Sequence, residues 1–61
     1  MKELALITGA AKNIGKGIAN TLFLDGYDCI LVDKDEEALK KVSTDFKEKF
    51  PDSNCYEYIA D

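Results

Sequence analysis

The stretch that decides the fold is TGAAKNIGKGIA, residues 8–19. It directly follows the apolar run LALI, residues 4–7, and leads into a helical pattern of apolar positions. A strand that turns abruptly into a helix leaves the first backbone N–H groups of that helix unpaired, and the helix dipole adds partial positive charge at the same place. The stretch therefore predicts a turn that can bind the pyrophosphate of a dinucleotide.

Two glycines give this turn its predicted geometry. Gly9 has no Cβ to obstruct the tight turn out of the strand, and Gly15 lets the start of the helix approach the phosphates or the neighbouring strand closely. Ile14 and Gly15 would then donate backbone N–H groups to phosphate oxygens. Because strand-turn-helix junctions also use glycine for purely steric reasons, the glycines alone leave a structural turn as an open alternative.

A second signal lies about 20 residues beyond the turn, where a dinucleotide site needs an acid that accepts hydrogen bonds from ribose hydroxyls. Asp33 stands there, at the end of the apolar run CILV, residues 29–32. An Asp after a strand more often caps a helix. Here Asp35 is available as the cap of a helical pattern that begins at Glu36, so Asp33 is the candidate ribose ligand.

The pattern after the turn predicts a helix, a strand and a second helix. In the first helix, Ile14, Ile18 and Leu22 recur along one face with the small residues Ala11, Gly15 and Ala19 alongside, and we expect this face to pack closely on the sheet. Gly26 supplies the left-handed position that ends this helix. The second helix carries an apolar stripe at residues 39, 42, 46 and 50, and Pro51 closes it.

A third strand is expected at residues 55–60, where the alternation leaves one wetter face, as in an edge strand. The chain thus alternates strand, helix, strand, helix, strand. Right-handed crossovers then give an α/β fold with a parallel three-stranded sheet in the order 3-2-1. This arrangement is the first βαβαβ half of a Rossmann fold.

Composition limits the chain to one small domain. A chain of 61 residues buries only about 60% of its unfolded surface, so we expect marginal stability. The chain is 46% hydrophobic and 33% charged, which is typical of globular proteins. No apolar run approaches the roughly 20 residues of a membrane span, and the start MKE has no signal-peptide pattern. We therefore expect a cytoplasmic chain without a membrane partner.

The cysteines and the charges exclude two further kinds of site. Cys29 and Cys55 have no nearby Cys or His, so we expect buried free thiols and no metal site, with a disulfide as the weaker alternative. Residues 1–24 carry three Lys against one Glu, whereas residues 25–61 carry five Lys against eleven acids. A basic face of the extent that nucleic acid needs is absent, so no nucleic-acid partner is expected.

The whole chain resembles the N-terminal segment of the short-chain dehydrogenase/reductase family, whose signature is Thr-Gly-x-x-x-Gly-x-Gly. Thr8-Gly9 is similar to the start of that signature and Ile14-Gly15 to its end. Residues 24–28 and 32–39 look like the family's second strand and the helix that follows it. The resemblance also implies that Asp61 takes the place of the family's Asp after strand three, which hydrogen-bonds the adenine amino group.

The turn departs from the signature at Asn13, which replaces the middle glycine. Asn tolerates left-handed backbone better than other non-glycine residues, and its amide can reach a ribose or phosphate. Lys12 and Lys34 occupy positions where family members that prefer NADP often carry bases. Asp33 favours NAD, because an ionised carboxylate beside a 2′-phosphate is a like-charge contact. We therefore expect NAD as the cofactor, with NADP as the alternative.

The family's catalytic pair, a Tyr followed four residues later by a Lys, has no counterpart here. Tyr27 is followed four residues on by Leu31 and Tyr56 by Ala60, and Tyr58 lies too near residue 61. We therefore interpret residues 1–61 as the N-terminal, incomplete part of an NAD(P)-binding Rossmann domain that lacks the catalytic residues.

The resemblance implies a parent oxidoreductase that transfers a hydride between a nicotinamide cofactor and an alcohol or carbonyl substrate. We expect the parent to be a homo-oligomer. A nucleotide-binding or sensing module without catalysis is the alternative. A P-loop phosphotransferase is disfavoured, because five residues separate Gly9 from Gly15 instead of four and Gly17 replaces the Mg²⁺-binding Ser or Thr.

Overall fold

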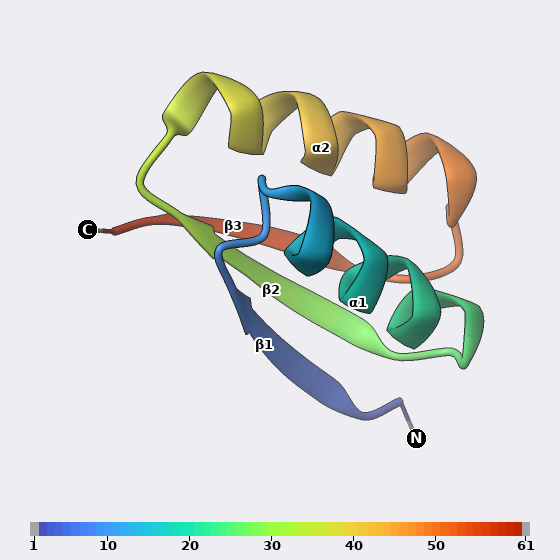
Figure 1. Cartoon of the computed structure of the whole chain (residues 1–61). Helices are drawn as coiled ribbons and strands as arrows, with labels where there is room; N and C mark the ends of the chain where they lie inside the picture. The colour runs from blue at the N-terminus through green and yellow to red at the C-terminus, as the bar shows by residue number, and fades with distance from the viewer. Residues whose placement is uncertain (1, 61) are drawn as a thin grey trace.

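Strands and helices alternate along the whole of residues 2–60, the part of the chain that the computed structural model describes (Figure 1). The elements are β1 (Leu4–Thr8), α1 (Asn13–Leu24), β2 (Asp28–Asp33), α2 (Glu36–Lys49) and β3 (Cys55–Ile59). The strands form one parallel sheet in the order β1-β2-β3. The predicted α/β fold with three parallel strands is confirmed, and β2 lies between the other two strands.

Both helices lie on the same face of the sheet (Figure 1), because both crossovers run in the same direction across it. The core forms between this face and the helices. From the sheet it contains Ile7, Cys29, Leu31 and Cys55, and from the helices Ala19, Phe23, Leu39, Val42 and Phe46. No helix within residues 2–60 combines the length and the apolar character that crossing a membrane would require.

Helix α1 packs on the sheet through only part of the face that the sequence predicted. Its buried residues are Gly15, Ala19 and Phe23, which recur every fourth position. Ile14 and Ile18 are 81% and 50% exposed, so the expectation that they face the core was wrong. The small side chains allow a closer approach of the helix, which leaves the larger isoleucines to its flank.

The aromatic side chains join the two helices at the end of the core far from the turn. The ring centroid of Phe23 lies 5.0 Å from that of Phe46 and 5.3 Å from that of Phe50. These separations fall in the favourable range for aromatic pairs. The stripe predicted for α2 is confirmed, since Leu39, Val42 and Phe46 are buried and Phe50 packs against them.

The start of α2 follows the predicted capping. The carboxylate of Asp35 accepts a hydrogen bond from the backbone N–H of Ala38 at 3.1 Å, as an N-cap residue does. Glu36 and Glu37 occupy the first turn, and Lys47 and Lys49 the last, which is the favourable placement of charge along the helix dipole. Asp35 therefore caps α2, and Asp33 is not required as its N-cap.

Within residues 2–60, no helix lies on the second face of the sheet (Figure 1). Large side chains on the strands are exposed, among them Leu4, Leu6, Tyr56 and Tyr58. Within residues 2–60, β1 pairs with β2 alone, so the other edge of β1 is open. Natural sheet edges are usually shortened, charged or bulged, and β1 shows none of these features.

The close approach of α1 predicts opposite effects for two neighbouring glycines. A Cβ at Gly15 would lie 2.2 Å from the Gly9 carbonyl oxygen, whereas a Cβ at Gly17 would meet nothing within 4 Å. We expect Gly15→Ala to lower the free energy of unfolding by about 1–3 kcal/mol, because backbone must move. Gly17→Ala should raise it by about 0.5–1 kcal/mol, because alanine favours helix.

Urea unfolding followed by circular dichroism measures both effects. Gly17→Ala is the matched control, since it adds the same methyl group to the same helix two residues away. Equal stability of the two variants would contradict the close backbone contact.

Candidate functional site

The turn after β1 is held against the end of β2. Gly9 has a φ of 64°, a left-handed conformation that favours glycine. The N–H of Ala10 donates to the carbonyl of Val32 at 3.0 Å, and the N–H of Lys12 donates back to the carbonyl of Gly9 at 3.0 Å. The chain therefore reverses tightly above β2, and α1 begins there.

The first turn of α1 presents backbone N–H groups at this place. Lys12, in the N-cap position, has extended backbone and makes no side-chain capping bond, and no acidic residue lies in the first turn. The Lys16 N–H donates to the Lys12 carbonyl at 2.8 Å, so the N–H groups of residues 13–15 precede this helical bond. These groups and the helix dipole make the turn favourable for an anion.

Asn13 fits this turn without a left-handed conformation. The structure records positive φ only at Gly9 and Gly26 within residues 2–60, and Asn13 is the first residue of α1. Asn13, at the middle position of the signature, therefore does not need the left-handed backbone that glycine adopts easily. The replacement of glycine by Asn13 leaves the turn intact and adds an amide side chain beside it.

Asp33 lies directly beside the turn and is nearly buried, with an exposed fraction of 6%. Its Oδ2 accepts the N–H of Ala11 at 3.0 Å, and its Oδ1 accepts the N–H of Asp35 at 3.0 Å. The hydrogen bonds from Asp35 and then Ala11 lower the pKa of this carboxyl group, and the charge of Lys12 lowers it further. Asp33 is therefore ionised at neutral pH.

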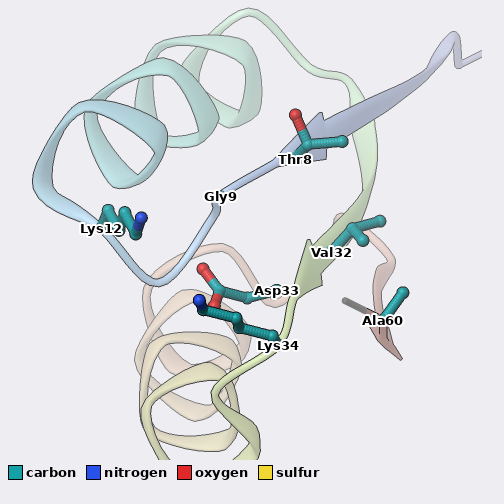
Figure 2. Close-up of a pocket in the computed structure, with 7 residues that line it drawn as sticks. All are labelled: Thr8, Gly9, Lys12, Val32, Asp33, Lys34 and Ala60. Atoms are coloured by element: carbon teal, nitrogen blue, oxygen red, sulfur yellow. The ribbon is translucent and has the colours of Figure 1, made fainter.

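Two adjoining hollows flank the turn. The first, of about 220 Å³, is shown in Figure 2. Its lining comes from the turn and from the carboxyl ends of the strands, and consists of Thr8, Gly9, Lys12, Val32, Asp33, Lys34 and Ala60. The second, of about 520 Å³, is lined by Thr8, Gly9, Lys12, Asn13, Ile14, Gly15 and Ile18. Since both include Thr8, Gly9 and Lys12, they form one continuous surface on either side of the turn.

The structure thus brings almost all the sequence-predicted site residues to one surface. Those residues are Gly9, Lys12, Asn13, Ile14, Gly15, Asp33 and Lys34. Asp61 lies outside the described residues, but Ala60 before it lines the first hollow and donates its N–H to the Asp33 carbonyl at 3.0 Å.

Sequence reasoning missed Thr8, Val32 and Ala60 as lining residues. Each lies at or just after the carboxyl end of a parallel strand, where α/β folds bind ligands.

The cysteines lie away from this surface, in the core. Cys29 and Cys55 are both free and buried, as predicted, and they pair in register across β2 and β3. Burial raises the pKa of the Cys29 thiol to about 11, so it stays protonated and is a poor nucleophile. Within residues 2–60, no group of three or more His, Cys, Asp or Glu side chains is placed to bind a metal ion.

A profile of the short chain dehydrogenase family matches residues 3–60. The chain belongs to this family. A diacetyl reductase ((S)-acetoin forming) from Staphylococcus epidermidis is 47% identical over 49 residues, which cover 80% of this chain and 19% of the relative. A very-long-chain 3-oxoacyl-CoA reductase from Rattus norvegicus is 40% identical over 48 residues, covering 79% of this chain and 15% of the relative. The chain therefore spans less than a fifth of the length of these curated relatives.

Two solved structures share the fold. L-sorbose reductase from Gluconobacter frateurii, complexed with NADPH and L-sorbose, superposes with a TM-score of 0.93 at 30% identity, covering 98% of this chain and 22% of that one. A short-chain dehydrogenase/reductase from Burkholderia phymatum, in complex with NAD, gives a TM-score of 0.89 at 25% identity, covering 98% of this chain and 21% of that one.

The lowered pKa of Asp33 predicts loss of stability in acid. Since the folded pKa lies below the unfolded value of about 3.9, the carboxylate stabilises the fold fully above that value, and this contribution disappears as the pH falls through the folded pKa. Asp28 acts in the same direction, because hydrogen bonds from Asn54 lower its pKa. Asp33→Asn should weaken the dependence of stability on pH below 4 and leave the part due to Asp28.

Urea unfolding midpoints between pH 2 and 6 check this expectation for both proteins. The carboxyl carbon shift of Asp33, followed by NMR over the same range, reports the site directly. An unchanged pH dependence in the variant, or an Asp33 pKa at the ordinary value, would contradict it.

Proposed function

We propose that residues 1–61 bind the adenosine and pyrophosphate half of a nicotinamide dinucleotide, as the N-terminal part of a Rossmann domain in an oxidoreductase. The parent would transfer a hydride between the cofactor and an alcohol or carbonyl substrate. The observation that carries the proposal is the pairing of an uncapped helix start with a nearly buried, ionised Asp33 on the two sides of one turn. Family membership adds support, since solved relatives bind NADPH or NAD.

The pyrophosphate would lie over the first turn of α1. The N–H groups of Ile14 and Gly15 would donate to its oxygens, and the missing Cβ at Gly15 lets that turn approach the Gly9 backbone. The side-chain amide of Asn13 would contact a phosphate or ribose oxygen. Asn13, Ile14 and Gly15 line the second hollow together with Ile18.

The adenosine ribose would lie in the first hollow, beside Asp33. Each carboxylate oxygen accepts one backbone N–H and keeps a further lone pair for a ribose hydroxyl. Adenine would then lie toward Ala60, and contact between Asp61 and its amino group stays a prediction. Lys12 and Lys34 line the same hollow, so a 2′-phosphate would meet two cations as well as the carboxylate. We infer a preference for NAD, because the carboxylate is the nearly buried member of this set.

The rest of the Rossmann domain would cover the surfaces that residues 2–60 leave open. In the family, strand one is central and pairs with strand four on the side away from strand two. The open edge of β1 and the bare sheet face with Leu4, Leu6 and Tyr58 fit such an interior position. A cytoplasmic location and a homo-oligomeric parent are further parts of the proposal. Two buried free thiols are compatible with a reducing compartment.

Cofactor titration tests the proposed function. NAD should bind about tenfold more tightly than NADP, because one like-charge contact in a partly desolvated site is worth about 1–2 kcal/mol. Asp33→Ala should narrow this ratio. Lys12→Ala and Lys34→Ala should each weaken the binding of NADP more than the binding of NAD. Lys41→Ala, at an exposed position of α2, should change neither affinity.

Isothermal titration calorimetry on the natural polypeptide that carries these residues, and on each variant, gives the affinities for both dinucleotides. Tighter binding of NADP by the unsubstituted protein would show that the two lysines outweigh Asp33. Absence of binding by both dinucleotides would refute the proposed function. The mass of that polypeptide also shows whether a Tyr-x-x-x-Lys pair can follow, which separates the oxidoreductase from a binding module without catalysis.

The open edge predicts how residues 1–61 behave as an isolated chain. We expect the chain either to associate through β1 or to be partly unfolded, because unpaired backbone groups and apolar side chains are exposed along that strand. Sedimentation analysis over a concentration series, with circular dichroism on the same samples, measures both. A cooperatively folded monomer at every concentration would contradict the proposed interior position of β1.

A further inference from the structure

We propose that Asp33 is a positioning residue for the anion-binding turn: its carboxylate fixes the course of the turn through Ala11, in addition to any contact with ribose. The contact joins residues 22 positions apart, with Oδ2 of Asp33 and the N–H of Ala11 separated by 3.0 Å. This contact holds the turn in the protein without ligand. Its consequence for anion binding rests on the proposed function.

The contact extends the pairing of β1 with β2 beyond the end of the strand. Thr8 is the last residue of β1 in register, opposite Val32. The next residues continue the pattern, since the N–H of Ala10 donates to the carbonyl of Val32 and the N–H of Ala11 to the side chain of Asp33. Two successive N–H groups thus point toward β2, and the backbone then turns so that the N–H groups of residues 13–15 begin α1.

The carboxylate also ties the turn to a second loop. Its other oxygen accepts the N–H of Asp35, the residue that caps α2. Asp33 is only 6% exposed, and its carboxylate is the acceptor for both of these N–H groups. An asparagine at this position has a single acceptor oxygen, and its NH₂ group would face whichever N–H group remained. Asp33→Asn therefore removes one of the two contacts while preserving shape.

The charge of Asp33 makes the two possible roles predict opposite changes in anion affinity. A carboxylate beside the turn repels a bound phosphate, so its removal should strengthen anion binding if Asp33 acts only as a charge or only as a ribose ligand. If Asp33 positions the turn, its removal should weaken binding of an anion that has no ribose. Inorganic pyrophosphate is such a probe.

Asp35→Asn is the matched control. It removes one negative charge two residues from Asp33, and asparagine caps a helix about as well as aspartate does. The backbone N–H of residue 35 is unchanged, and the contact between Asp33 and Ala11 stays in place.

The experiment measures amide hydrogen exchange at Ala11 without ligand, and pyrophosphate affinity from the amide shifts of Ile14 and Gly15. In the natural polypeptide, Asp33→Asn should speed exchange at Ala11 by about tenfold, the loss expected for one hydrogen bond. It should also weaken pyrophosphate binding by about threefold or more. Asp35→Asn should leave exchange unchanged and bind pyrophosphate equally or slightly more tightly.

The outcomes separate the two proposals. Unchanged protection of Ala11 in Asp33→Asn, or tighter pyrophosphate binding by it than by the unsubstituted protein, would overturn the positioning role while the proposed function stands. Faster exchange at Ala11 in a protein that binds neither pyrophosphate nor either dinucleotide would support the positioning role and refute the proposed function. Should Asp33→Asn not fold by circular dichroism, Asp33→Ser, which keeps one acceptor on a shorter side chain, carries the same expectations.

Discussion

The contact of α1 with the backbone at Gly9 is the constraint on which the rest of the structure depends. A methyl group at Gly15 would overlap the Gly9 carbonyl, so the helix lies against the turn at a depth that only a glycine permits. That depth selects the small residues of α1 as its packing face. It also carries Phe23 into contact with Phe46 and Phe50, so the same helix joins the turn at one end and the aromatic cluster at the other.

The depth of the helix also sets the chemistry of the turn. Because α1 starts directly above the end of β2, its first N–H groups and the Asp33 carboxylate lie on opposite sides of one short backbone segment. An anion site beside a carboxylate is normally unfavourable. Here backbone N–H groups of Ala11 and Asp35 already neutralise part of the carboxylate's field, and Lys12 adds a positive charge nearby. In the proposed complex, Asp33 would therefore accept ribose hydroxyls without a prohibitive effect on the neighbouring phosphates.

In the part of the chain that the structure describes, the helices cover one face of a sheet whose strands carry apolar side chains on both faces. Leu4 and Leu6 project from β1 on the bare side, and Tyr56 and Tyr58 from β3. All-parallel sheets are normally covered on both faces, because their crossover connections place helices on each. This asymmetry agrees with a chain that spans less than a fifth of the length of these two curated relatives.

The sequence by itself determined the order of elements, the glycine turn, the cap at Asp35 and the apolar stripe of α2. These features follow from local patterns: strand and helix periodicity, the missing Cβ of glycine, and an acid directly before a helix. The same local reasoning made the predicted packing face of α1 too wide, since it included Ile14 and Ile18 together with Gly15 and Ala19. Periodicity identifies a helix face, but only the distance between helix and sheet decides which of its residues are buried.

The tertiary structure alone decided what Asp33 contacts. Sequence reasoning placed it at the end of a strand as a ribose ligand, whereas the bond to Ala11 depends on how two loops 22 residues apart come together. It also decided that Asn13 needs no left-handed backbone and that Thr8, Val32 and Ala60 line the hollow. Such contacts are set by the register of β1 on β2 and by the depth of α1. Local sequence patterns do not predict them, because side-chain hydrogen bonds of this kind require positions accurate to a few tenths of an ångström.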